Sequence, residues 1–421
     1  MNEGKITNNK KIISGIDSVV YALAKGAKSV MILSHLGRPK GIKNMKYSLT
    51  PVAVELNSVL KQVHKDPHSL GKYSQVFKIF AANPAPNVRF LSDCVGSEIR
   101  EVCDNPEPGS IFLFENLKFH LEEEGIGMDT SGNKIYSTIQ EDNTFRESLR
   151  SLGDVFVNDA FSLSHHAYSS MLGTAFDSKA AGLLLSKEIK HLSKLIKKPD
   201  RPFLAILGGT KIIEKFHLID NLQDKVSDMI IAGAMAFPFL RRLHRMHTGH
   251  SIYDVEGSKV VKTLMKKARK NKVTMHFPVD FLSGSKLGAV RLESVKSGIE
   301  DEWMGLDIGP ESCVNFERVI SRSKTILWMG PPGAYELDHF QAGTQCMLFD
   351  IVKATLSGAM SVLVGEDTAN CAARWGQTEN VTHVSTGSEA AADMLKGKVL
   401  PGVAALSDFS YDIKVNLKLN L

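Results

Sequence analysis

Short apolar runs alternate along this chain with longer amphipathic segments. The apolar runs are rich in Val, Ile, Leu and Phe, which is typical of buried parallel strands. The segments between them repeat apolar residues at helical spacing, for example over residues 50–61, 144–152 and 256–270. Strands that alternate with helices predict an α/β fold with doubly wound parallel sheets. The expected strands are Val30–Leu33, Ile111–Phe114, Val155–Val157, Phe203–Leu207, Met229–Ile231, Val273–Phe277, Thr325–Trp328 and Met360–Val364.

These strands are too many for one sheet, and a long predicted helix over residues 181–198 divides them. An earlier helix is expected to start with Thr50 as N-cap and Pro51 as its first residue. A stretch with several prolines and a glycine, residues 64–86, is predicted to be a surface insertion in the first domain. We therefore expect a first domain over 1–180, an interdomain helix over 181–200, a second domain over 201–399, and a C-terminal segment and tail over 400–421.

Composition narrows the functional class. The 421 residues are 43% hydrophobic and carry a net charge of +5, which suits small acidic substrates. No basic cluster is interleaved with aromatic residues, so nucleic acid is not an expected partner. The first ten residues lack the apolar segment of a signal peptide, and the longest apolar run, 229–240, is too short to cross a bilayer. Five scattered cysteines without a CxxC pattern fit reduced thiols, so we expect a cytoplasmic protein that does not enter membranes.

Polar and charged residues directly follow the first predicted strand, in the order Ser34-His-Leu-Gly-Arg-Pro-Lys-Gly41. Ligands of open α/β sheets bind just past the carboxyl ends of strands. His35 and Arg38 would therefore meet a substrate, beside Gly37, which allows a close backbone approach. A histidine and an arginine together indicate an anionic ligand. The alternative is a strand-ending turn with two solvated side chains.

Four glycine-containing loops follow predicted strands in the second half of the chain. Glycines at a strand-to-helix turn let backbone amides approach phosphates, and a helix N-terminus adds positive potential. The loop with Lys211 lacks the GxxxxGK[ST] spacing of a Walker A loop, but its lysine could neutralise a transferring phosphoryl group. One loop alone fits a chance turn, whereas four in one domain favour a nucleotide site. The loops are Gly208–Lys211, Trp328–Glu336, Val364–Thr368 and Ser385–Glu389. Glu336 could bind ribose there, and Asp367 suits Mg²⁺.

These residues resemble those of phosphoglycerate kinase over nearly the whole chain, from about Gly4 to Asp408. The sequence is most similar to the vertebrate enzymes of this family. The motifs that carry the resemblance are SHLGRPKG at Ser34, FENLKFHLEEEG at Phe114, LGDVFVNDAF at Leu152, RPFLAILGGTK at Arg201, WMGLDIGP at Trp303, MGPPGAYE at Met329 and GKVLPGVAALS at Gly397.

The resemblance implies two Rossmann-like lobes with parallel sheets, joined by a helical hinge, in a monomer. It implies reversible phosphoryl transfer in glycolysis, from 1,3-bisphosphoglycerate to ADP, giving 3-phosphoglycerate and ATP. The first lobe would bind the phosphoglycerate and the second the Mg²⁺-nucleotide. Hinge closure would bring the reacting groups together and exclude water.

The resemblance also assigns roles to individual residues. The residues that it implies for phosphoglycerate binding are Lys10, Lys11, Ser34, His35, Gly37, Arg38, Lys118, His165 and His166. Nucleotide binding falls on Gly209, Thr210, Lys211, Lys215, Gly233, Gly305, Leu306, Gly330, Pro332, Glu336, Asp367 and Thr368. The catalytic residues that it implies are Lys211, Lys11, Gly365 and Gly387. It also implies that Asp367 binds Mg²⁺.

The sequence departs from the family pattern at this expected site. Lys11, Lys118 and His166 stand where the family has arginines, and lysine does not replace arginine at a bidentate phosphate contact. Glu366 stands in a glycine triplet next to the γ-phosphate position. The alternative to an active enzyme is therefore a catalytically impaired or dead relative that at most binds Mg²⁺-nucleotide. An NAD-dependent Rossmann enzyme is disfavoured, because GxGxxG after a first strand is absent.

The resemblance places Met1 just after the family's first strand, whose Asp and Asn hold substrate. From this we expect a first domain that lacks an interior strand and exposes apolar sheet edges. Residues 1–180 should then be cut by protease well before the second domain. The stretch 64–86 and the tail after Asp408 have no family counterpart.

Overall fold

The structure is a computed structural model that describes residues 6–66, 86–173, 176–286 and 288–407. Most of the expected insertion and the whole tail after Asp408 lie outside the described residues. The chain forms two compact units, Met1–Lys187 with Val399–Leu421, and Glu188–Lys398. The division falls within helix α8 (Leu183–Lys197), close to where the sequence predicts a single long helix.

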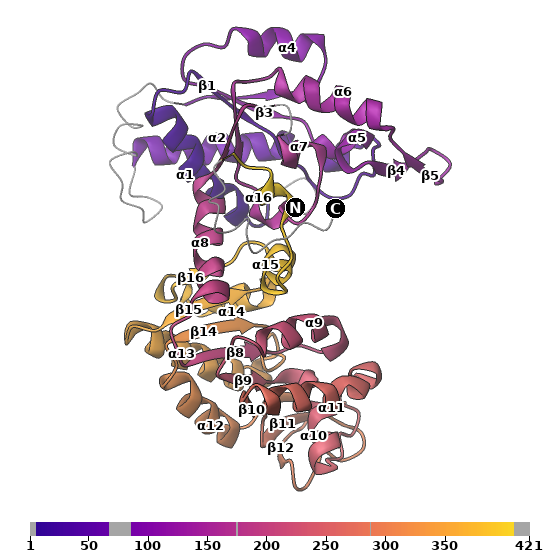
Figure 1. The fold of residues 1–421 in the computed structure, drawn as a ribbon, viewed down its shortest axis with the longest axis vertical. Coiled ribbons are helices and arrows are strands. Elements are labelled where there is room, and N and C mark those ends of the chain that lie inside the picture. The colour runs from indigo at the N-terminus through magenta and orange to yellow at the C-terminus, as the bar shows by residue number, and fades with distance from the viewer. Residues whose placement is uncertain (1–5, 67–85, 174–175, 287, 408–421) are drawn as a thin grey trace. The chain divides into compact units, whose positions relative to one another are not determined.

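A parallel three-stranded sheet forms the centre of the first unit, in the order β1 (Ser29–Ile32), β3 (Ser110–Phe114), β2 (Val88–Leu91). Alternate side chains of β3 point to opposite faces. Ile111 packs with α1 (Lys10–Ala24) and α2 (Thr50–Lys65) on one face. Phe112 and Phe114 pack on the other face with α4 (Ser97–Asp104) and α6 (Ile139–Arg150). Figure 1 shows α4 and α6 near β3.

The remaining elements of the first unit lie outside this sheet. Strands β6 (Val155–Asn158) and β7 (Ser178–Ala181) form a separate parallel pair, and β4 (Ile126–Met128) and β5 (Lys134–Tyr136) form an antiparallel hairpin. The C-terminal segment joins this unit through α16 (Pro401–Ala404). Gly402 N–H donates to the Ser164 carbonyl at 3.0 Å, and Asn158 Nδ2 donates to the Gly402 carbonyl at 3.0 Å. The short helices α5 (Leu121–Glu124) and α7 (Ser169–Leu172) complete the unit.

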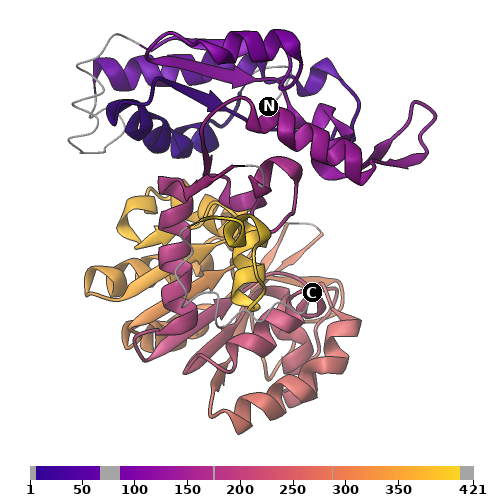
Figure 2. The same cartoon turned by 45° about the horizontal axis from the view of Figure 1, so that its top comes forward.

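Six parallel strands form the main sheet of the second unit and confirm the predicted fold class. Their order is β10 (Thr274–His276), β9 (Asp228–Ile231), β8 (Phe203–Leu207), β14 (Thr325–Met329), β15 (Met360–Val364), β16 (His383–Val384). Helices α12 (Pro310–Ser321), α13 (Ala342–Leu356) and α14 (Glu366–Arg374) pack on one face around buried Trp328. These helices, orange to yellow in Figures 1 and 2, lie against the strands of the sheet.

Successive strands are added toward one edge of the sheet after β8 and toward the other edge after β14. The sheet therefore has a topological switch point between these two strands. β9 and β10 follow β8 toward one edge, and β14, β15 and β16 lie toward the other. Loops at the carboxyl ends of strands on either side of a switch point diverge and leave a crevice for ligands. The glycine-containing loops that the sequence singles out therefore follow the carboxyl ends of strands near this switch point.

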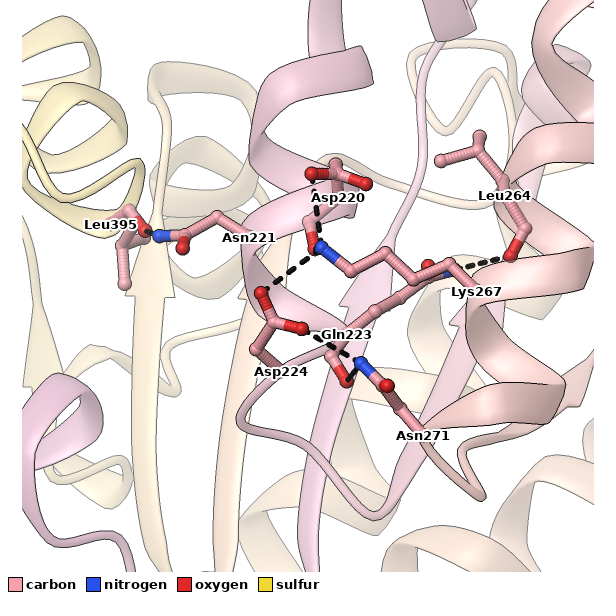
Figure 3. Close-up of polar contacts among 8 residues, drawn as sticks. All are labelled: Asp220, Asn221, Gln223, Asp224, Leu264, Lys267, Asn271 and Leu395. Carbon is pink, nitrogen blue, oxygen red and sulfur yellow. Dashed lines mark hydrogen bonds and ion pairs between the residues drawn. The ribbon is translucent and has the colours of Figure 1, made fainter.

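A polar network anchors α9 (Ile212–Leu222), the helix that follows the first glycine loop, to two other helices (Figure 3). Lys267 in α11 (Val255–Lys270) donates to the Asp220 carbonyl at 2.7 Å and pairs with the Asp220 and Asp224 carboxylates, each at 3.0 Å. Asn221 Nδ2 donates to the Leu395 carbonyl of α15 (Ser388–Leu395) at 2.5 Å. Helix α9, which carries Lys215, is thus hydrogen-bonded to both α11 and α15.

Three features of the fold differ from the sequence expectations. An antiparallel sheet, in the order β12 (Val290–Ser294), β11 (Asp280–Ser285), β13 (Trp303–Ile308), was not predicted, because the predicted strands were continuous apolar runs and β12 instead alternates apolar and polar residues. Helix α2 starts at Thr50 itself, with Leu49 as N-cap, and it continues through Lys65 into the expected insertion. Helix α6 starts at Ile139, before the predicted 144, because Thr138 and Glu141 form a capping box. Helix α10 (Ala236–His244) completes the second unit.

Candidate functional site

The loop after β1 in the first unit is fixed to the loop after β3. Leu117 N–H donates to the Ser34 carbonyl at 3.2 Å, and Gly41 N–H donates to the Lys118 carbonyl at 3.1 Å. Asn116 Nδ2 donates to the Leu36 carbonyl at 2.7 Å. These bonds hold the carboxyl ends of two adjacent strands together, so the side chains of both loops gather at one edge of the sheet.

His35 lies in the loop after β1 and is affected by charges from several segments. Its pKa is lowered from 6.5 to about 4, first by burial and then by the nearby positive charges of Lys118, Lys11 and His166, while Glu124 opposes the shift. Charged residues from three separate parts of the chain therefore act on His35. At neutral pH His35 is an uncharged imidazole, so it contributes hydrogen-bonding groups and not positive charge.

Lys118 is compensated within the unit by two neighbours. Its Nζ pairs with Glu124 Oε1 at 2.8 Å and lies 4.9 Å from the centre of the Tyr168 ring. Tyr168 is also hydrogen-bonded to Glu124. Partial burial opposes the shift, but these hydrogen bonds hold the pKa of the Glu124 carboxyl below its ordinary value. The ammonium of Lys118 is thus positioned, and part of its charge is already balanced.

His166 stacks on the same tyrosine, and His165 packs against His166. The rings of His166 and Tyr168 lie 4.6 Å apart at an interplanar angle of 14°, and His165 and His166 lie 3.9 Å apart. Arg38 is exposed, and its charge acts on Tyr168. Tyr168 and Glu124 were not among the residues predicted for the site. Glu124 lies in the FENLKFHLEEEG motif and Tyr168 lies two residues after His166, but nothing in their spacing shows that they contact Lys118.

Gly37 is the position in this loop where only glycine fits. Its φ is +65°, and a Cβ there would collide with the ring of Tyr47. Ser34 contributes its carbonyl to the loop contact with Leu117, as described above. Lys10 is exposed at the first residue of α1, and no contact of its side chain with the His35 cluster is recorded among the described residues.

The glycine loops after β8 and β14 in the second unit pack directly on each other. Gly208 N–H donates to the Met329 carbonyl at 3.0 Å. A Cβ on Gly208 would collide with the carbonyls of Gly330 and Pro331, so glycine is required by this close approach. Gly233, after β9, lies against the backbone of Gly209. The structure thus brings the loops after three neighbouring strands together at the switch point.

Lys215 lies beneath these loops. Its Nζ donates to the Gly208 carbonyl at 2.6 Å, and the Met329 carbonyl is 3.5 Å away. Burial lowers the pKa of Lys215 from 10.5 to about 8, while Asp367 and Glu214 oppose the shift. Lys211, in contrast, is more than half exposed and pairs with Glu214 at 3.1 Å. The two lysines therefore differ in position. Lys215 is bonded to the loop backbone, whereas Lys211 is accessible from solvent.

The loop after β15 completes this edge of the sheet. Helix α14 begins after Gly365, whose φ is +105°, and Glu366 and Asp367 lie exposed in its first turn. Thr368 is fully buried, and its Oγ1 accepts a hydrogen bond from Gly330 N–H at 2.8 Å. Thr368 therefore connects the loops after β14 and β15. The exposed carboxylate of Asp367 is of the type that Mg²⁺ prefers when phosphates and water supply its other ligands.

Other predicted nucleotide residues surround the same sheet edge. The Ser251 hydroxyl accepts a hydrogen bond from Gly305 N–H at 2.9 Å, and the Leu306 carbonyl accepts one from Ala334 N–H at 2.7 Å. Asp307, which the sequence analysis did not single out, is buried and accepts from Gly343 N–H at 2.7 Å. Burial raises its pKa to about 7. Exposed positions are Thr210 and Glu336, whereas Pro332 and Gly387, the N-cap of α15, are buried.

A family profile described as phosphoglycerate kinase matches residues 1–398. The chain belongs to the phosphoglycerate kinase family. It is 48% identical over 410 residues to phosphoglycerate kinase of Drosophila melanogaster, covering 97% of this chain and 93% of that one. It is 48% identical over 412 residues to human phosphoglycerate kinase 2, with the same coverage. The family resemblance seen in the sequence is therefore confirmed, and with it the assignment of the chain to a family of kinases.

Solved structures give the same answer for the fold. The phosphoglycerate kinase of Coxiella burnetii superposes with a TM-score of 0.77 at 27% identity, covering 96% of this chain and 92% of that one. The enzyme of Pyrococcus horikoshii superposes with a TM-score of 0.70 at 23% identity, covering 98% and 94%, and supports the fold alone. None of the helices in the described part of this phosphoglycerate kinase family member has the length and apolar character needed to cross a membrane.

Proposed function

We propose that this chain catalyses reversible phosphoryl transfer between 1,3-bisphosphoglycerate and ADP, giving 3-phosphoglycerate and ATP, with Mg²⁺ bound to the nucleotide. Family membership supports the reaction. The observation that carries the proposal is the cluster around His35, where Lys11, Lys118 and His166 act together at the carboxyl edge of the β1–β3 sheet. Such a concentration of cationic groups fits a ligand with a carboxylate and a phosphate.

In the first unit the residues of this cluster would bind and orient phosphoglycerate. Lys11, Lys118 and Arg38 supply positive charge, and the neutral His35 supplies a hydrogen bond without adding repulsion between cations. His166, stacked on Tyr168, has an aromatic partner that limits its rotation. Phosphoryl transfer requires mainly positioning and charge stabilisation, so side chains held in place before binding contribute directly to the rate.

In the second unit the backbone amides of the loops around Gly208, Gly330 and Gly365 would bind the nucleotide phosphates. Lys215 would hold the loops in place and Lys211 would reach the transferred group from the solvent side. Asp367 would hold Mg²⁺, which neutralises phosphate charge when it is bound. Further roles proposed on the same grounds are ribose binding by Glu336 and phosphate contacts by Gly387, at the N-cap of α15.

A second candidate function, nucleotide binding without efficient turnover, rests on specific observations. Lys118 is engaged by Glu124 at 2.8 Å, and a lysine cannot form the two parallel hydrogen bonds that arginine gives to a phosphate. Glu366 adds a carboxylate to the first turn of α14, beside the proposed phosphate position. Removing one stabilising group from a transition state costs about 10²–10³ in rate.

A coupled assay with 3-phosphoglycerate and Mg²⁺-ATP separates the two candidates. Turnover well above that of the Lys211→Ala variant supports the proposed reaction. Calorimetry that shows binding of Mg²⁺-ADP, together with turnover no higher than that of the variant, supports the second candidate and refutes the first. We also propose a cytoplasmic monomer; sedimentation at the mass of a dimer would contradict the monomer.

A further inference from the structure

A carboxylate, a thiol and an imidazole meet in the first unit at the ends of two adjacent strands. Asp93 and Cys94 lie in the loop after β2, and His120 directly follows the helical turn Leu117–Phe119 after β3. Because β2 and β3 pair in parallel, both loops leave the sheet at its carboxyl edge. The fold thus brings three different metal-ligating side chains together from two segments of the chain.

The three donor atoms are close enough to share one metal ion. His120 Nε2 and Asp93 Oδ1 are 2.7 Å apart, and the ligand atoms of Asp93, Cys94 and His120 all lie within 4.8 Å of one another. Zinc holds nitrogen and oxygen at about 2.0–2.2 Å and sulfur at about 2.3 Å, so its tetrahedral ligands are about 3.3–3.6 Å apart. The imidazole and carboxylate would separate by about 0.6 Å, and the thiol would approach by no more than about 1.2 Å.

Neighbouring groups hold these side chains in place. Asp93 Oδ1 accepts a hydrogen bond from Cys94 N–H at 2.7 Å. The rings of His120 and Phe145 lie 5.3 Å apart, and Cys94 is buried in the same apolar cluster as Phe145. Side chains that are already ordered lose little conformational freedom when they bind an ion. The ligand set is therefore largely arranged before any metal arrives.

A metal ion can reach this group from the solvent side. The side chains of His120 and Asp93 are 25% and 43% exposed. His120 also borders an open pocket of about 420 Å³, which Val95, Glu141 and Phe145 help to line. Water from this pocket is available as a further ligand, as at zinc sites where the protein supplies three ligands.

The charges around Cys94 suit a cation. The carboxylates of Asp93 and Glu123 both act on the Cys94 thiol, and together with burial, the larger effect, they keep a free thiol protonated by raising its pKa. A metal that binds the sulfur removes this proton outright. Negative charges that disfavour an isolated thiolate stabilise a divalent cation placed beside it.

We propose that Asp93, Cys94 and His120 bind one transition-metal ion of the zinc class, with water from the adjoining pocket as the fourth ligand. On binding, the Cys94 thiol releases its proton to solvent, and the metal takes the place of the hydrogen between His120 Nε2 and the Asp93 carboxylate. Thiolate and imidazole ligands favour zinc over Mg²⁺, which prefers oxygen ligands. This site is separate from the proposed Mg²⁺ position at Asp367, which lies in the second unit.

The test titrates the full chain, first freed of metal with a chelator, with Co²⁺ as a spectroscopic probe for a zinc site. The expected result is one bound equivalent with a thiolate-to-cobalt charge-transfer band in the near ultraviolet and the intense visible bands of a four-coordinate ion. Zinc should remove both features, and an excess of Mg²⁺ should not. Cobalt binding without the charge-transfer band, or a site that Mg²⁺ empties, would overturn the proposal.

Matched variants identify the sulfur ligand. Cys94→Ser should abolish the charge-transfer band and His120→Gln should weaken cobalt binding. Cys103→Ser, which alters a buried cysteine of the same apolar cluster, should leave the band unchanged. A band that persists in Cys94→Ser would overturn the assignment.

Two measurements on the unaltered chain do not depend on any variant folding. X-ray absorption at the zinc edge should show one sulfur at about 2.3 Å among nitrogen and oxygen ligands. Zinc should also slow hydrogen exchange in the peptides that contain β2 and β3, because the ion links the loops that follow these strands, and leave the peptide that contains β14 unchanged. A zinc ion without a sulfur ligand, or equal slowing at β14, would refute the proposed site.

Discussion

The buried imidazole of His35 should make the stability of the first unit depend on pH. The pKa of His35 is about 4 in the folded protein against 6.5 unperturbed, because burial and then the charges of Lys118, Lys11 and His166 disfavour the imidazolium. The unfolded chain therefore binds a proton at a higher pH than the native chain. Stability from this group is complete above pH 6.5 and is lost as the pH falls toward 4.

The size of the effect follows from this difference. Between pH 7 and pH 5 the unfolded state gains a proton on His35 while the folded state does not, and the loss of unfolding free energy is about 2 kcal/mol. That corresponds to roughly a 30-fold increase in the equilibrium constant for opening. By pH 4 the loss is about 3 kcal/mol, and it becomes complete only below the pKa of His35 in the folded protein.

Hydrogen exchange followed by mass spectrometry measures this effect within one unit. The peptide that contains β3 reports on the first unit, and the peptide that contains β14 reports on the second as an internal control. In His35→Gln, which keeps a side-chain nitrogen but cannot be protonated, β3 should lose much less protection between pH 7 and 5 than in the unaltered protein. Comparison of the two proteins at each pH cancels the intrinsic pH dependence of exchange. Equal loss of protection in both would refute the reasoning.

Three further outcomes test other contacts. Glu124→Gln removes the carboxylate that compensates Lys118, so calorimetry should show 3-phosphoglycerate binding about tenfold tighter, from about 1.4 kcal/mol of relieved repulsion; weaker binding would mean that Glu124 mainly positions Lys118. Lys267→Met should destabilise the second unit by about 1–2 kcal/mol in urea followed by tryptophan fluorescence, with the exposed Lys266→Met as a near-neutral control; equal effects would contradict the network of Figure 3. Limited proteolysis should cut the first unit before the second, because β6 leaves apolar residues 60% (Val155) and 48% (Val157) exposed; equal resistance would contradict this.

Sequence patterns predicted the second unit better than the first for a physical reason. The strands of its six-stranded sheet are buried on both faces, so they read as continuous apolar runs such as Phe203–Leu207 and Met360–Val364. Strand β2 was not predicted, because Arg89 is exposed and interrupts its apolar pattern. Strand β12 has the same difficulty, with exposed Val290 and Leu292 next to polar residues. Partial burial breaks the continuous apolar run on which these strand predictions relied.

The candidate site shows the same division. His35 was identified by its chemistry at a strand end, and Lys11 and Lys118 were assigned through the family resemblance. In the structure the charges of both lysines act on His35. The compensation of Lys118 by Glu124 and Tyr168 was not predicted, because it depends on where a short helix and a loop place their side chains. A sequence shows that a cation is present at a strand end, but its effective charge depends on contacts that only the fold determines.

This compensation bears directly on the choice between an active enzyme and a binding protein. Lys11, Lys118 and Arg38 outnumber the carboxylates of Glu123 and Glu124, so the cluster around His35 keeps an excess of positive charge and should still attract a phosphorylated carboxylate. Attraction depends on net charge, whereas transition-state stabilisation depends on donors that match the geometry of the transferring phosphoryl group. Replacing arginine by lysine preserves the net charge that attracts the ligand but weakens the stabilisation of the transition state. Ligand binding should therefore survive in this chain to a greater extent than turnover, and Lys11→Arg and Lys118→Arg should raise kcat with little change in the affinity for 3-phosphoglycerate. If both arginine variants changed affinity and kcat by the same factor, lysine at these positions would not be what limits the rate.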